Sequence, residues 1–203
     1  MSHGDDLPAV SGQGSAGIGG GLVNEQLDVL KLVAERLQHA DIAYMISGSI
    51  ALNYYAQPRL TRDIDIVVAL QREDTERVIN LFAEDFYIDA DAVRNAIAQL
   101  GMFNIIHYDH VLKVDFIVRK ETPYRQEEFA RRMTVEIHGV TMWLVTAEDL
   151  LLSKLLWAAE SHSEMQLQDV RNLIRAVADL DWAYIERWAD ELTIGELLRE
   201  VRG

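Results

Sequence analysis

Cysteine is absent from the 203-residue chain, and so is any apolar run long enough to cross a bilayer. Without cysteine there can be no disulfide framework and no thiolate zinc site. A membrane helix needs roughly 20 predominantly apolar residues, and the first residues contain neither a basic segment nor an apolar signal core. We therefore expect a cytoplasmic protein with no membrane segment.

Positive charge is also scarce, because 19 lysine and arginine residues stand against 33 aspartate and glutamate residues, a formal net charge of −14. Lysine and arginine drive nonspecific binding to phosphate backbones, so this composition argues against a protein that coats DNA or RNA. A local basic segment remains, which contains Arg119, Lys120, Arg125, Arg131 and Arg132, and Arg59 and Arg62 lie beside the acidic pair Asp63 and Asp65. A solvated helix face laced with Glu127 and Glu128 explains this segment somewhat better than a polynucleotide track.

The stretch from residue 44 to residue 70 carries two signals, and the first is a glycine–serine pair. Gly48 and Ser49 follow the short apolar run 42–46 and precede a helical-looking segment, 50–55. Glycine lets the backbone pass close to a ligand, and the start of a helix offers free N–H donors. This succession of strand, pair and helix predicts a phosphate-binding turn.

The second signal is an acidic pair at the start of a β-like run. In a strand, alternate side chains share a face, so Asp63 and Asp65 should point one way while Ile64 and Ile66 point into the core. A later β-like run places Asp115 between two apolar residues in the same manner. Hard cations such as Mg²⁺ take oxygen ligands and combine carboxylates with substrate phosphates. These acids are therefore candidate ligands of a divalent metal.

A third feature is one lysine in an apolar helix. Thr146 and Asp149 resemble a capping box, which predicts a helix from Ala147 to about Glu160. Its middle is almost wholly apolar except for Lys154. Burying a lysine unpaired is costly, so this side chain should either snorkel to the surface or face a negatively charged site.

The remaining periodicity predicts helices and two hairpins around these motifs. One expected helix begins near residue 24, and others cover 74–84, 90–100 (closed by Gly101), 123–132 and 164–178. One expected hairpin pairs 102–107 with 111–119, and the other pairs 134–137 with 140–144. Residues 1–22 are rich in glycine and serine and are expected to form a flexible tail. Residues 23–145 should form the core, and residues 146–203 a helical C-terminal subdomain.

The ordered set of motifs resembles the nucleotidyltransferase superfamily that includes DNA polymerase beta. Within it the chain is most similar to small bacterial nucleotidyltransferases related to type IV abortive-infection toxins. The resemblance runs from about Asn24 to the C-terminus and includes the segments 61–65, 103–107, 113–115 and 148–154. It implies an α+β nucleotidyltransferase fold, in which a mixed sheet is flanked by helices and followed by a C-terminal helical layer.

The resemblance also implies an activity: transfer of a nucleoside monophosphate from a nucleoside triphosphate to an acceptor hydroxyl, with release of pyrophosphate. It assigns Mg²⁺ or Mn²⁺ to the three aspartates and the nucleotide phosphates to the remaining site residues. Lys154 would face the phosphates, joined by Arg62. Asp169 recurs in relatives, although a surface ion pair on a helix explains it equally well. The expected site thus consists of Asp63, Asp65, Asp115, Gly48, Ser49, Arg62 and Lys154.

Other classes of protein stay open at this point. A catalytically idle nucleotide-sensing or partner-binding module would have the same fold, and a structural interaction protein would carry the acids merely as surface residues. Because all three acids are present, the enzyme is favoured. The resemblance leaves the acceptor open among tRNA, a protein and a small molecule, and it implies a cognate antitoxin as a partner to look for.

Overall fold

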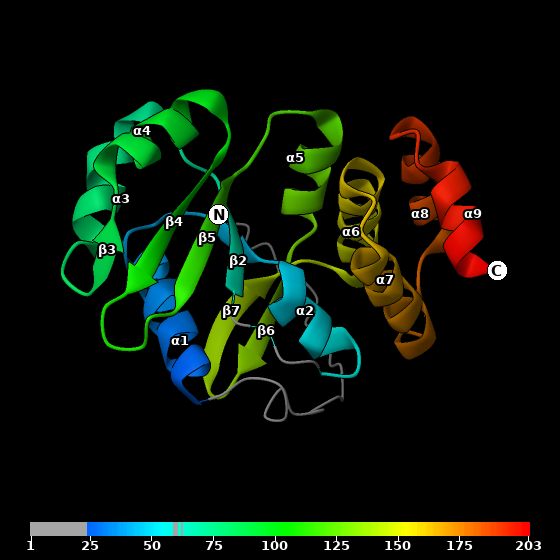
Figure 1. Cartoon of the computed structure of the whole chain (residues 1–203), viewed down its shortest axis with the longest axis horizontal. Helices are drawn as coiled ribbons and strands as arrows, with labels where there is room; N and C mark the ends of the chain where they lie inside the picture. The colour runs from blue at the N-terminus through cyan, green and yellow to red at the C-terminus, as the bar shows by residue number, and fades with distance from the viewer. Residues whose placement is uncertain (1–23, 59–60, 62) are drawn as a thin grey trace, which may run out of the picture.

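The computed structural model describes residues 24–58, 61 and 63–203 (Figure 1). The expected tail over residues 1–22 lies outside these residues, and so does Arg62 of the expected site. The division into a core over 23–145 and a helical subdomain over 146–203 stays a prediction.

Within the described residues, one mixed sheet forms the centre of the molecule. Its strands are β1 (Tyr44–Ile46), β2 (Asp63–Val68), β3 (Phe86–Ile88), β4 (Met102–His107), β5 (Lys113–Val118), β6 (Met133–Ile137) and β7 (Val140–Leu144). Their order is β3-β4-β5-β2-β1-β7-β6. The β2–β5 and β1–β7 pairs are parallel, and the other pairs are antiparallel. The predicted mixed α+β fold and both predicted hairpins are confirmed.

Helices flank the sheet, and those after β7 gather at one end of the molecule (Figure 1). They are α1 (Asn24–His39), α2 (Gly48–Tyr55), α3 (Thr75–Phe82, after the short 3-10 helix η2, Arg72–Asp74), α4 (Ala90–Gln99), α5 (Pro123–Ala130), α6 (Ala147–Ser161), α7 (Glu164–Ala176), α8 (Trp182–Glu191) and α9 (Gly195–Arg202). Helix α6 packs on α7 and α8 and also contacts α2. None of these described helices is long and apolar enough to span a membrane.

Two helix ends show how local sequence sets the boundaries. Helix α6 begins where its cap predicts, because Thr146 Oγ1 accepts a hydrogen bond from the Asp149 N–H at 3.3 Å. The end of α4 differs from the expectation: the left-handed residue is Leu100, with φ of 50°, rather than Gly101. The Gly101 N–H still donates to the Ala96 carbonyl at 2.8 Å, which closes the helix.

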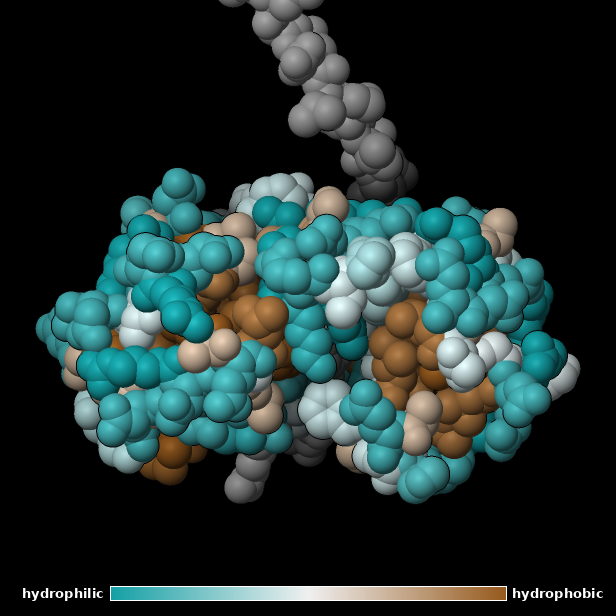
Figure 2. Space-filling model, turned by 90° about the horizontal axis from the view of Figure 1, so that it is seen from above, coloured by the Kyte–Doolittle hydropathy of each residue, from teal (hydrophilic) through white to brown (hydrophobic). Residues whose placement is uncertain are grey.

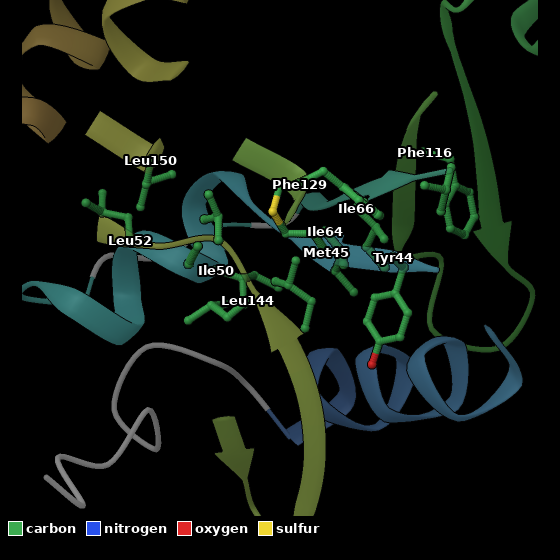
Figure 3. Packing of buried hydrophobic residues seen from close by; sticks show 14 of the residues in the cluster. Tyr44, Met45, Ile50, Leu52, Ile64, Ile66, Phe116, Phe129, Leu144 and Leu150 are labelled. Atoms are coloured by element: carbon green, nitrogen blue, oxygen red, sulfur yellow. The ribbon is translucent and has the colours of Figure 1, made fainter. Parts of the chain in front are cut away.

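Strand β2 shows the alternation that the sequence predicts. Ile64 and Ile66 are buried, and Figure 3 shows them packed in the core with Met45 and Leu144. Asp63 is exposed and Asp65 half-buried, since they lie on the opposite face of the sheet. This face is the one that carries the candidate site.

Candidate active site

The acidic side chains come together across strands β2 and β5. In the register of this parallel pair, Asp65 lies opposite Asp115 and Asp63 lies opposite Lys113. Neighbouring strands are about 4.8 Å apart. Residues separated by some fifty positions in the chain therefore meet on one face of the sheet, as expected from the alternation, while their role as metal ligands stays a prediction.

A cavity of about 770 Å³ opens over this face of the sheet. One end contains the three aspartates with Gly48, Ser49, Lys113 and Lys154. The other end lies where β5 leads into α5, and helix α6 forms part of the wall. Viewed from above, the molecule is hollowed between two halves, and apolar surface is visible on both sides of the hollow (Figure 2). The cavity is large enough for a nucleotide-sized ligand.

The turn at the start of α2 is fastened to Asp65. Gly48 has φ of +60°, and a Cβ atom placed on it would lie 1.9 Å from Asp65 Oδ2. The Ser47 N–H donates to the Asp65 carbonyl at 2.9 Å, and the Ser49 N–H donates to the Asp65 carboxylate. A phosphate bound at this helix start would therefore lie beside the acidic pair.

Substituting Gly48 by alanine should destabilise the protein more than the same change at Gly139. Both glycines have positive φ, so alanine costs about 1 kcal/mol or more of backbone strain at either position. Only Gly48 adds a clash with Asp65, because nothing lies within 4 Å of a Cβ at Gly139. Urea unfolding of the two variants measures the difference. Equal losses in the free energy of unfolding would show that a side chain at position 48 does not clash with Asp65.

Lys113 lies among the carboxylates, and the sequence-based site did not include it. Its Nζ is 2.7 Å from Asp115 Oδ2 and 3.6 Å from Asp63 Oδ1. The hydrogen bond that Lys113 donates to the Asp115 carboxylate raises the pKa of Lys113, so the ammonium stays charged. The strand alternation could have found this residue, because Lys113 shares a face with Asp115.

The donor set fits an oxygen-liganded cation, although the carboxylates are not gathered around one point. Among the described residues, no group of three or more acidic, histidine or cysteine side chains is arranged to hold a metal ion. The Lys113 ammonium lies near two of the three acids and supplies positive charge there. Asp115 Oδ1, however, is buried without a hydrogen-bond partner. A buried carboxylate oxygen of this kind needs a partner, and Mg²⁺ or Mn²⁺ would be a suitable one.

Burial raises the pKa of Asp65, and the charges of Asp115 and Asp63 raise it further. Lys154 and the Ser49 N–H lower it in part. A raised pKa means that the folded protein binds this proton more tightly than the unfolded chain does. The metal-free fold should therefore lose stability as the pH rises from the ordinary aspartate value through the raised one.

Comparing wild type with the Asp65→Asn variant isolates this pH effect. In EDTA, the free energy of unfolding of wild type minus that of the variant should fall as the pH increases from about 4 to 8. Urea titrations across this range measure it. A difference that stayed constant or rose would contradict the raised pKa.

Lys154 is buried and paired with a carboxylate. It is 5% exposed, and its Nζ lies 2.8 Å from Asp169 Oδ2 and 3.0 Å from Gln166 Oε1, both on α7. Asp169 is 2% exposed, so the explanation of this residue as a surface ion pair is wrong. The snorkelling alternative for Lys154 is wrong for the same reason. The lysine lines the cavity and its charge acts on Asp65.

The expected solvated helix face is wrong at Glu128. Glu128 is 2% exposed, and its carboxylate accepts bonds from Arg125 Nη1 at 2.8 and 3.0 Å. Arg131 Nε donates to the buried Asp149 at 3.1 Å. Several of the basic side chains in this segment are thus paired with buried carboxylates rather than solvated.

Solved structures share this fold. An antigenic nucleotidyltransferase-like protein from Paracoccidioides brasiliensis is 19% identical, with a TM-score of 0.61 and 89% of each chain covered. The lincosamide antibiotic adenylyltransferase LnuA, bound to lincomycin, is 13% identical with a TM-score of 0.53, over 77% of this chain and 99% of its own. The antibiotic-resistance factor ANT(2'')-Ia is 13% identical with a TM-score of 0.53, over 88% and 94%. At these identities the likeness establishes the fold, which is that of nucleotidyltransferases.

The family follows from the sequence match. Residues 35–203 match the family of nucleotidyl transferase AbiEii toxins of type IV toxin–antitoxin systems, and the chain belongs to that family. It is a nucleotidyltransferase, so the resemblance stated from the motifs is confirmed. No curated protein gives a significant match.

Proposed function

We propose that this protein transfers a nucleoside monophosphate from a nucleoside triphosphate to an acceptor hydroxyl and releases pyrophosphate. The observation that carries the proposal is the register of β2 and β5, which sets Asp65 opposite Asp115 beside the turn at Gly48. Mg²⁺ or Mn²⁺ held by Asp63, Asp65 and Asp115 would supply charge neutralisation for the triphosphate and activation of the attacking oxygen.

Each remaining residue has a task set by its position. Gly48 and Ser49 would hold the β- and γ-phosphates at the start of α2. Lys154 would offset negative charge on the leaving pyrophosphate. The acceptor oxygen forms a bond to the α-phosphorus while the bond from this phosphorus to the bridging oxygen breaks. Asp115 would take the acceptor's proton.

Lys113→Gln should strengthen metal binding about fivefold. Removing this cation takes away a competitor for the Asp63 and Asp115 carboxylates, and partly exposed ion pairs of this kind contribute about 1 kcal/mol. Calorimetric titration with Mn²⁺ measures the affinity. Lys31→Gln on α1 is the control for net charge. Weaker binding by the Lys113 variant would mean that the lysine supports the site.

Labelled nucleoside triphosphates test the proposal directly. The protein is incubated with them, Mg²⁺ or Mn²⁺ and a cell extract, and the labelled fraction is identified as RNA, protein or small molecule. Label that depends on Asp63 and Asp65 supports transfer and names the acceptor. Triphosphate binding without label would instead favour a nucleotide-sensing module, and the absence of both would favour an interaction protein.

The finer biological setting follows from the family and is part of the proposal. A cognate antitoxin is the proposed protein partner, and the cytoplasm is the proposed location. The acceptor classes are tRNA, a protein or a small molecule. Co-purification with the product of an adjacent gene would test the antitoxin.

A further inference from the structure

The charge of the cavity differs from that of the chain as a whole. Among the described residues that line it, four carboxylates face five cationic side chains, which are Lys113, Arg119, Lys120, Arg125 and Lys154. In the full sequence the acids outnumber the lysines and arginines by 33 to 19. Positive charge is therefore concentrated in this cavity, where the cationic side chains outnumber the carboxylates.

Three of these cations, Arg119, Lys120 and Arg125, lie away from the three aspartates, at the other end of the cavity, where Glu128 is the remaining carboxylate. Strand β5 runs along the floor from Asp115 towards Arg119, and the Arg119 N–H continues the sheet by donating to the Val68 carbonyl at 2.9 Å. Four extended residues span about 13 Å. Between the two ends the floor is formed by apolar side chains of Val67 and Ile117. The cavity thus has an acidic end, an apolar middle and a basic end.

Arg125 is held in place at the basic end by two neighbours. Its Nη1 donates to both oxygens of Glu128 and lies 2.6 Å from Ser153 Oγ, and Ser153 Oγ in turn donates to Glu128 at 2.5 Å. All of these bonds from the guanidinium use Nη1, so contacts with the described residues leave its Nε and Nη2 donors for a ligand. A guanidinium fixed in this way binds a planar pair of oxygens at low entropic cost.

Arg119 adds a donor that lacks a partner. Its Nη2 pairs with Glu121 at 2.7 Å, but its Nε is buried with no hydrogen-bond partner in the described part of the chain. Buried donors of this kind are normally satisfied. Lys120 is exposed at the same rim of the cavity. Both arginines therefore offer donors that an anion could use.

We propose that Arg119, Lys120 and Arg125 form a second anion-binding site, the basic end of the cavity, which binds a phosphate group of a substrate. This rests on the proposed function, because the acidic end would hold the reacting phosphates. The phosphate at the basic end belongs either to the nucleotide or to the acceptor. Arginine and lysine recognise both through the same charge-assisted hydrogen bonds.

Calorimetry on Arg125→Gln and Lys120→Gln separates the two sources. The first titration uses ATP with Mg²⁺, and the second adds a 5′-phosphorylated dinucleotide to protein saturated with a non-hydrolysable ATP analogue. We expect Arg125→Gln to weaken one of the two affinities about tenfold or more, since hydrogen bonds to charged groups are worth about 1.5–3 kcal/mol. Loss in the first titration assigns the nucleotide phosphate, and loss in the second assigns the acceptor phosphate.

The matched control is Arg187→Gln, which also removes one guanidinium and one ion pair, to Glu127 at 3.0 Å, outside the described lining of the cavity. Lys120→Gln tests the same site if Arg125→Gln unfolds the protein, because the Lys120 side chain is exposed. Variants that match the control in both titrations would overturn the proposal. That result leaves the proposed function standing as long as Asp65→Asn abolishes turnover, so the two failures are distinguishable.

Discussion

Asp65→Asn is expected to lower nucleotidyl-transfer turnover by about a thousandfold or more while the protein stays folded. The substitution removes a carboxylate from the candidate metal site, and the charge stabilisation that a bound metal supplies is worth several kcal/mol. Because burial and neighbouring acids make the charged form of this residue unfavourable, the metal-free variant should be at least as stable as wild type at neutral pH. Activity and stability should therefore change in opposite directions.

Steady-state turnover with labelled triphosphate and thermal unfolding in EDTA measure the two quantities. Asp28→Asn, an exposed carboxylate on α1, is the matched control and should change neither. Asp63→Asn should lose turnover as Asp65→Asn does, and both variants should lose metal binding. Wild-type turnover in either variant would remove the basis for the proposed site.

Asp115→Asn should separate binding from chemistry. The side-chain carbonyl oxygen of the asparagine could still coordinate a metal ion, but the amide could not take the proton of an acceptor hydroxyl. Triphosphate with Mg²⁺ should therefore still bind in calorimetry while turnover stops. A loss of triphosphate affinity as large as that of the Asp63 variant would contradict the division of roles.

The second large effect is expected at the buried pair of Lys154 and Asp169. Asp169→Asn leaves the Lys154 ammonium buried without its carboxylate, and breaking a buried ion pair in this way costs about 3–5 kcal/mol. Urea unfolding measures the loss. Glu186→Gln, which breaks the exposed pair with Arg202, is the control and should cost at most about 1 kcal/mol.

A double variant distinguishes the structural role of this pair from its role in the site. Lys154→Met combined with Asp169→Leu removes both buried charges, so it should recover much of the lost stability. Turnover should remain low, because the cation near the nucleotide phosphates is missing. Recovery of both stability and turnover would show that Lys154 only supports the packing of α6 on α7.

The strongest local signals in the sequence were sufficient to predict most of the helices and strands. The cap at Thr146 fixed the start of α6, and the apolar alternation of β2 fixed which side chains enter the core. Strand β3 was missed because three residues are too few for alternation to show. The left-handed end of α4 fell on Leu100 because the chain there is held by its bonds to the helix and not by glycine alone.

The sequence by itself determined the ordered motifs, the face to which each aspartate points and the family, since these depend on residue types and short-range periodicity. Only the tertiary structure decided which charges meet. It placed Lys113 near Asp63 of the neighbouring strand, paired Lys154 with Asp169 from another helix, and paired Arg131 with the buried Asp149 of α6. The physical reason is that a charge is stabilised by whatever lies within a few ångströms, and strand pairing and helix packing bring those partners from distant parts of the chain.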